Sequence, residues 1–89
     1  MDNEDRAFRE EEVRQAHAAR SILENPLWTA AWDTFMDEIV RAWAETGSGE
    51  NERRELLYFQ LTAAEQARGN LETILETGKM AEQQLENDA

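Results

Sequence analysis

The stretch that decides the fold is residues 26–45, which read PLWTAAWDTFMDEIVRAWAE. Its largest apolar side chains follow one another at steps of four, three, four and four, as residues on one face of an α-helix do. With their apolar neighbours they cover about 220° of such a helix, whereas a surface helix needs an apolar face of little more than 100°. The helix therefore requires cover on two sides, from this chain or from another. The apolar positions are Trp28, Trp32, Phe35, Ile39 and Trp43, flanked by Leu27, Ala31, Met36 and Val40.

Two local signals mark the ends of this helix. Asn25 is a favoured N-cap and Pro26 a favoured first helical residue, so the pair separates a helix over about residues 5–24 from the one over about 26–45. Residues 47–49 read Gly-Ser-Gly and form the clearest break in the chain, because two glycines around a serine favour a flexible turn.

A third helix is predicted over about residues 52–77. Alternating steps of four and three place most of its apolar side chains on one coiled-coil-like seam. Gly78 is expected to end or weaken the helix, which leaves residues 79–86 as a weak helical tail. We call the seam the inner seam; it consists of Leu57, Leu61, Ala64, Arg68, Leu71 and Leu75.

These patterns predict an all-α chain, because no stretch shows the alternation of a strand. We expect a single domain over residues 1–89: a helical hairpin of residues 26–45 and 52–77, with the first helix packed across it. A chain of this length buries a limited core and often depends on a partner, so a dimer or larger homo-oligomer is expected. The predicted interface consists of Trp28, Trp32, Phe35, Met36, Ile39, Val40, Trp43, Leu57, Leu61, Leu71 and Leu75.

The charge balance narrows the class of partner. The formal net charge is −11 and the acidic residues are spread along the whole chain. Such a surface is repelled by DNA, RNA and anionic lipid, so neither direct nucleic-acid binding nor membrane binding is expected. Basic protein partners remain compatible with it, and the charge can also serve solubility alone. The chain has no cysteine, no apolar run long enough to span a bilayer, and an acidic start unlike a signal peptide.

Catalytic and metal-binding signals are weak. The single histidine, His17, is expected to face solvent on the first helix with Arg14 and Arg20 as neighbours, where no carboxylate would orient it as a general base. Asp33 and Asp37 share a helical face, but this face is the polar one and reads as a solvated acidic surface. Ser21 and Ser48 lack the setting of an activated nucleophile. We therefore expect no enzyme activity, no cofactor and no metal site.

Five segments together resemble a group of small helical proteins encoded in the structural and packaging gene modules of tailed bacteriophages. The likeness extends over about residues 18–85 and involves no catalytic signature. It implies a setting of virion assembly or DNA packaging and transfers no active-site residue. The segments are Ala18–Trp28, Ala31–Asp33, Ala42–Trp43, Glu52–Leu57 and Glu76–Leu85.

Together these observations predict a non-enzymatic protein–protein interaction module. It would act as a homo-oligomeric accessory of phage head assembly or DNA packaging, with itself and another phage protein as partners. Its expected location is the cytoplasm of the bacterial host or the virion. The alternative is an acidic inhibitor that occupies the basic nucleic-acid-binding groove of a target enzyme. A monomer with a contiguous acidic face and complete apolar burial would favour this alternative.

Overall fold

The computed structural model describes residues 1–88 and consists of three α-helices, which confirms the all-α class. They are α1 (Asn3–Leu23), α2 (Pro26–Ala44) and α3 (Asn51–Asn87). The bounds of α1 and α2 differ from the predicted ones by one or two residues, which is the usual scatter at helix ends. Ala89, the last residue of the predicted domain, lies outside the described residues.

Capping groups define the starts of the first two helices. The Asp2 carboxylate accepts a hydrogen bond from the Asp5 N–H at 2.7 Å, and the Asn25 side-chain oxygen accepts one from the Leu27 N–H at 2.8 Å. The predicted boundary at residues 25 and 26 is therefore confirmed. Glu50 occupies the N-cap position of α3 without a capping side-chain bond; its carboxylate accepts the Gly47 N–H instead, at 2.7 Å.

The expected break at Gly78 is wrong, because α3 continues as one helix from Asn51 to Asn87. Gly78 is buried, as are Ala16, Ala19 and Ala81, and here α1 crosses α3. A Cβ atom added to Gly78 would overlap the Cβ of Ala16 and lie 2.9 Å from the carbonyl oxygen of Glu12. The glycine thus lets two helix backbones approach closely, and this packing holds in place the segment that the sequence alone left as a weak tail.

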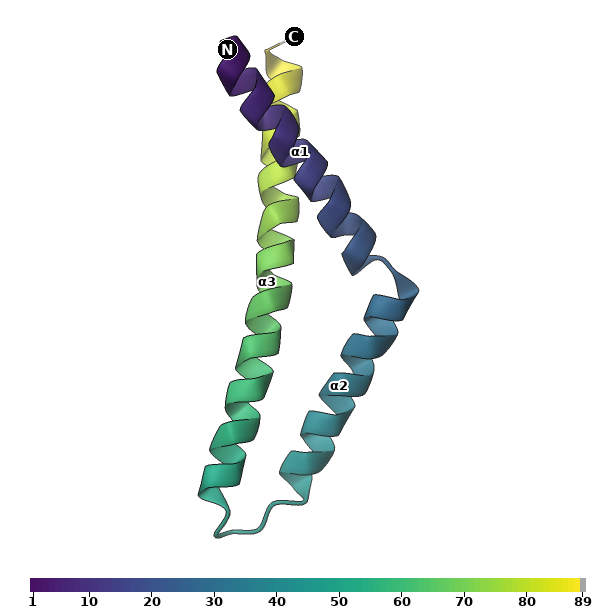
Figure 1. The fold of residues 1–89 in the computed structure, drawn as a ribbon, viewed down its shortest axis with the longest axis vertical. Helices are drawn as coiled ribbons and strands as arrows, with labels where there is room; N and C mark the ends of the chain where they lie inside the picture. Colours follow the sequence, from purple (N-terminus) through teal and green to yellow (C-terminus); the bar gives the residue numbers. More distant parts are fainter. Residues whose placement is uncertain (89) are drawn as a thin grey trace.

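The helices are arranged around α3, the longest of them (Figure 1). Helix α1 crosses the C-terminal half of α3, and α2 runs antiparallel beside the N-terminal half. Helix α1, and not α2, makes most of the contacts with α3. Near the chain ends, Arg6 pairs with Asp88 at 2.8 Å, which ties the start of α1 to the end of α3.

The molecule is long and thin. Its principal extents are 61 × 25 × 15 Å, and α1 lies over α3 where the two helices cross (Figure 1). The radius of gyration is 18.9 Å, against about 12 Å for a compact domain of this length. Domains are normally built from at least two packed layers around one core. In this chain two helices are stacked only where α1 crosses α3 (Figure 1).

Candidate interaction surfaces

The tryptophan side of α2 faces the N-terminal half of α3, since Trp32 and Trp43 lie beside Arg68 and Arg54 of that helix. Trp28 and Trp32 stack with ring centroids 6.2 Å apart, and the guanidinium of Arg68 lies 5.0 Å from the centroid of the Trp32 ring. Ile39 and Leu57 are the buried hydrophobic residues on this side of the molecule. Long side chains hold the two helices apart. Most of the other side chains between α2 and α3 are therefore only partly buried.

The predicted interface residues therefore meet first within one chain. Val40 and Trp43 remain 63% and 44% exposed, and their role in contacts with another chain stays a prediction. Of the remaining predicted residues, Ile39 and Leu57 are buried, and those of intermediate burial are Trp28, Trp32, Phe35, Met36, Leu61, Leu71 and Leu75.

An arginine anchors the turn between α2 and α3. Arg54 Nε–H donates a hydrogen bond to the Thr46 hydroxyl oxygen at 2.6 Å, and the same hydroxyl donates to the Trp43 carbonyl oxygen at 2.7 Å. The Arg54 guanidinium also lies 5.6 Å from the centroid of the Trp43 ring. Thr46 is buried by these contacts. The connection between the helices is thus tied down at Thr46, immediately before the Gly-Ser-Gly turn.

A second seam runs along the side of α3 opposite the inner seam, and most of its residues are exposed. Its members follow heptad spacing, with steps of three and four in strict alternation, and none of them is charged. Charged side chains of the same stretch, including Glu65, Glu72 and Glu76, lie on another flank of the helix. We call this stripe the outer seam; it consists of Leu56, Phe59, Ala63, Gln66, Asn70, Thr73, Thr77 and Met80.

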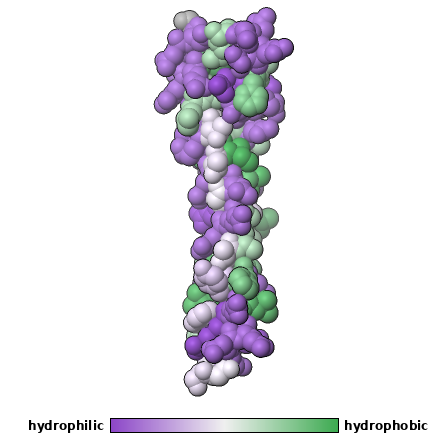
Figure 2. All heavy atoms as spheres, turned by 90° about the vertical axis from the view of Figure 1, so that its left-hand side faces the viewer, coloured by the Kyte–Doolittle hydropathy of each residue, from purple (hydrophilic) through white to green (hydrophobic). Residues whose placement is uncertain are grey.

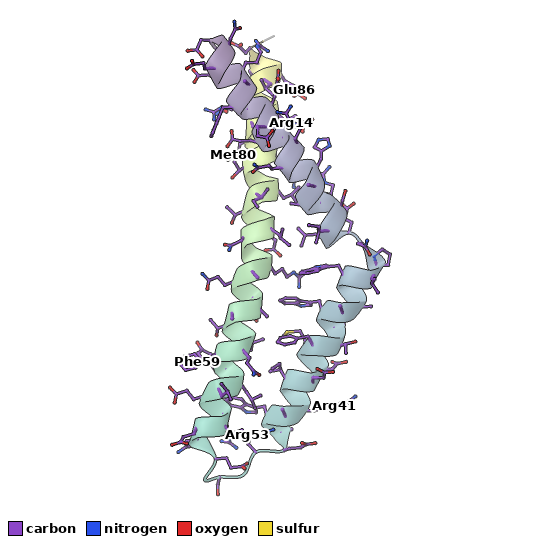
Figure 3. The ribbon with its side chains drawn as sticks, viewed as in Figure 1. Arg14, Arg41, Arg53, Phe59, Met80 and Glu86 are labelled. Carbon is purple, nitrogen blue, oxygen red and sulfur yellow. The ribbon has the colours of Figure 1, made fainter. Side chains whose placement is uncertain are left out.

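The three large side chains of the outer seam are its most exposed apolar groups. Leu56, Phe59 and Met80 are 58%, 57% and 62% exposed. Phe59 and Met80 both project from the edge of α3 that faces away from α2 (Figure 3). In the view onto this edge, pale and green residues gather along the middle and lower parts, whereas the upper end is mostly purple (Figure 2).

Sequence reasoning missed the outer seam because it searched for large apolar side chains. Five of the eight members are Ala, Gln, Asn or Thr, which a count of apolar residues leaves out. The usable signal was the absence of charge: about one residue in three of this chain is charged, yet eight successive heptad positions carry none. Depletion of charge is a mark of the buried centre of an interface.

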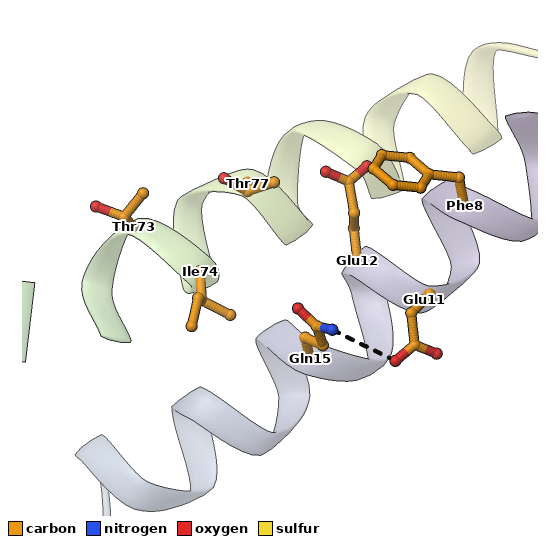
Figure 4. Close-up of a pocket in the computed structure, with 7 residues that line it drawn as sticks. All are labelled: Phe8, Glu11, Glu12, Gln15, Thr73, Ile74 and Thr77. Carbon is orange, nitrogen blue, oxygen red and sulfur yellow. Dashed lines mark hydrogen bonds between the residues drawn. The ribbon is translucent and has the colours of Figure 1, made fainter. Parts of the chain in front are cut away.

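A cavity of about 200 Å³ lies between α1 and α3, near the C-terminal end of the outer seam (Figure 4). Phe8, which is 62% exposed, and Ile74 contribute apolar wall. Gln15 Nε2 donates a hydrogen bond to Glu11 at 3.5 Å. The other lining residues are Glu12, Thr73 and Thr77, so two members of the outer seam border the cavity.

The charge at this cavity is set by a pair on α1. Arg14 donates a hydrogen bond to Glu11 at 2.9 Å and adds its positive charge, and both effects hold the pKa of Glu11 below its usual range. Glu11 therefore stays ionised at neutral and mildly acidic pH. The cavity accordingly suits an apolar or uncharged group better than an anion.

The residues considered as catalytic or metal-binding candidates are exposed and do not form one cluster. His17 and Ser21 are exposed on α1, Ser48 lies in the turn, and Asp33 and Asp37 are exposed on α2. Within residues 1–88, no group of three or more His, Cys, Asp or Glu side chains is placed to hold a metal ion.

None of the helices described here combines the length and the apolar character needed to cross a membrane. Comparison of the chain with family models, with curated proteins and with solved structures finds no match.

Proposed function

We propose that this chain is a non-enzymatic protein–protein interaction module that functions as a homo-oligomer. We place it in the assembly of phage heads or the packaging of phage DNA, in the cytoplasm of the bacterial host or in the virion. The self-association is supported by the surface that the single chain leaves exposed. The phage setting is supported by the resemblance of residues 18–85 to small helical phage proteins.

One observation carries the self-association. The chain exposes 6732 Å², whereas a folded monomer of 10.3 kDa is expected to expose about 5,350 Å². The excess is about 1,400 Å², and a stable protein–protein interface removes about 800 Å² from each partner. A second copy that covers about 800 Å² of this chain would therefore remove more than half of the excess.

The pattern of burial favours an oligomer over the acidic inhibitor. An inhibitor that acts as a monomer would combine its acidic face with complete burial of apolar side chains. Instead, Leu27, Val40 and Phe59 are all more than half exposed. This pattern lacks the complete apolar burial that the inhibitor alternative requires.

The mass in solution tests the self-association. Size-exclusion chromatography with light scattering, at micromolar concentration and above, should give at least twice the chain mass of 10.3 kDa. Because apolar burial drives the association, the mass should persist when the salt concentration is raised. A monomer mass throughout this range would contradict the proposal.

The phage setting needs a separate experiment. A tagged chain, purified from bacteria infected with a phage that encodes it, should recover head, portal or packaging proteins of that phage. The matched control is the same purification with Phe59 and Val40 both changed to Glu, which removes exposed apolar contacts. Recovery of host proteins alone would contradict the assembly role and leave the self-association intact.

A further inference from the structure

We infer that two copies of this chain pair through their outer seams as an antiparallel two-stranded coil of α3 helices, with residue i of one copy opposite residue 136 − i of the other. This inference rests on the proposed self-association and specifies its geometry. It assigns a role to a surface of α3 that α2 does not cover and that α1 borders only at its C-terminal end.

The charge of the chain selects this surface. Two copies that each carry a net charge of −11 repel one another wherever acidic faces meet. The outer seam is free of charge over eight successive heptad positions, from Leu56 to Met80. A pairing of about 25 residues extends about 36 Å along the helix. Such a contact is long enough to remove much of the excess exposed area.

The order of side chains along the seam selects the antiparallel direction. Large apolar groups lie at the N-terminal end of the seam, and polar groups occupy its centre. A parallel pair would place Phe59 opposite Phe59 and Ala63 opposite Ala63, so neighbouring layers would demand very different helix separations. The antiparallel pair places Phe59 opposite Thr77, so neighbouring layers differ less in size than they would in a parallel pair.

The register follows from the apolar residues at the two ends of the seam and the amide residues at its centre. With the stated register, Leu56 lies opposite Met80, and Gln66 lies opposite Asn70. Amide groups buried at a coiled-coil seam need hydrogen-bonding partners, and Gln–Asn pairs provide them on both sides of the two-fold axis. Such polar residues at core positions also fix which register is adopted.

The cavity near the end of the seam supports the same register. Phe59 of one copy lies opposite Thr77 of the other, and Thr77 lines the cavity between α1 and α3. The cavity wall includes Phe8 and Ile74, so an incoming aromatic ring would meet apolar side chains. Burial of Phe59 and Phe8 together removes two of the most exposed aromatic side chains from water.

Cysteine cross-linking tests the direction and the register. The chain contains no cysteine, so any disulfide reports on the introduced positions alone. Ala63→Cys and Thr73→Cys variants, with tags of different length, are co-expressed and oxidised. They should form a mixed disulfide dimer, because residues 63 and 73 face each other and a disulfide requires Cα atoms no more than about 7 Å apart. The control pair, Glu65→Cys with Glu72→Cys on the acidic flank, should remain uncross-linked.

Other cross-linking results would overturn the inference. Disulfide formation by Ala63→Cys with itself would show a parallel pair, and formation between Ala63→Cys and Gln66→Cys would show another antiparallel register. If light scattering gives a dimer mass but residues 63 and 73 do not cross-link, the interface lies elsewhere on the chain. The antiparallel pairing would then be wrong, and the proposed homo-oligomeric function would stand. A monomer mass in light scattering would contradict both the antiparallel pairing and the proposed self-association.

A pair of charge substitutions tests the surface without cysteines. Phe59→Glu should weaken dimerisation about tenfold or more, because it places a charge at the seam of both copies. Tyr58→Glu is the matched control, since Tyr58 has the same exposed fraction of 57% but lies off the seam. Circular dichroism should show equal helix content for both variants at high concentration. Equal dimerisation constants for the two variants would overturn the inference.

Discussion

The two contacts that α3 makes are built on opposite principles. At its C-terminal half, Gly78 and Ala81 meet Ala16 and Ala19 of α1, and the backbones approach so closely that these small residues are buried. At its N-terminal half, tryptophan and other long side chains separate α3 from α2, and Ile39 and Leu57 are the buried apolar side chains. Close approach of backbones and burial of large apolar area are therefore different properties. In this chain the close approach occurs where α1 crosses α3, whereas the large apolar side chains between α2 and α3 are mostly half-buried.

The largest effect is expected from a bulky side chain at the close crossing. Gly78→Leu should destabilise the chain by about 3 kcal/mol, because its Cβ alone would overlap Ala16 and the obstacle at Glu12 is backbone. Thermal unfolding followed by circular dichroism measures the change. A loss of 3 kcal/mol in a domain of this size lowers the midpoint by more than about 10 °C.

Gly69 provides the matched control on the same helix. A Cβ added at Gly69 has no atom within 4 Å, so Gly69→Ala should raise stability by about 0.5–1 kcal/mol through helix propensity. If Gly78→Ala were stabilising to the same extent, the close approach of α1 and α3 would not be a feature of the protein in solution.

A smaller loss of stability is expected from truncating a tryptophan between α2 and α3. Trp32→Ala should cost about 2–3 kcal/mol, somewhat below the usual loss for a fully buried aromatic, because Trp32 is only partly buried. Trp43→Ala should cost less, since Trp43 is 44% exposed at the end of α2. Equal shifts in the thermal midpoint would show that the aromatic packing between α2 and α3 has a different centre.

Charge reversal on the acidic flank should have little effect on either contact. Glu72 pairs with Arg68 at 3.3 Å and Glu76 with Lys79 at 3.2 Å, and both pairs are exposed. Exposed pairs contribute about 0–1 kcal/mol each, so Glu72→Lys with Glu76→Lys should preserve the fold. The oligomer mass should also persist, because both positions lie off the outer seam. Loss of the oligomer with unchanged helix content would show that the acidic flank takes part in binding.

The smallest effect concerns pH at α1. The pKa of Glu11 is lowered by its hydrogen bond and charge interaction with Arg14. A carboxyl group whose pKa is lower in the folded state stabilises the fold above its ordinary pKa, and this contribution disappears as the pH falls through the folded-state value. The difference in stability between the unmodified chain and Glu11→Gln should therefore be small near neutral pH and vanish in acid. A difference that grew on acidification would have the wrong sign.

Much of the helix pattern was predictable because its signals act over a few residues. The Asn25–Pro26 boundary depends on a local cap and on the fixed φ angle of proline. The Gly-Ser-Gly turn depends on backbone freedom at residues 47–49. Helical spacing also predicted that the tryptophan stripe shares one face, and in the structure Trp32 and Trp43 of this face lie toward α3.

Only the tertiary structure decided how the helices pair. A glycine near a helix end reads as a break in the sequence, but Gly78 stays helical because packing against Ala16 gains more than the loss in helix propensity. The choice of α1 as the closer partner of α3 depends on backbone approach, which no periodicity of apolar residues reports. The outer seam can be recognised in the sequence as a run of uncharged heptad positions, but only the placement of α1 and α2 shows that most of it stays exposed. Local chemistry determines where helices begin and end, whereas their contacts depend on shapes that the chain brings together from distant positions.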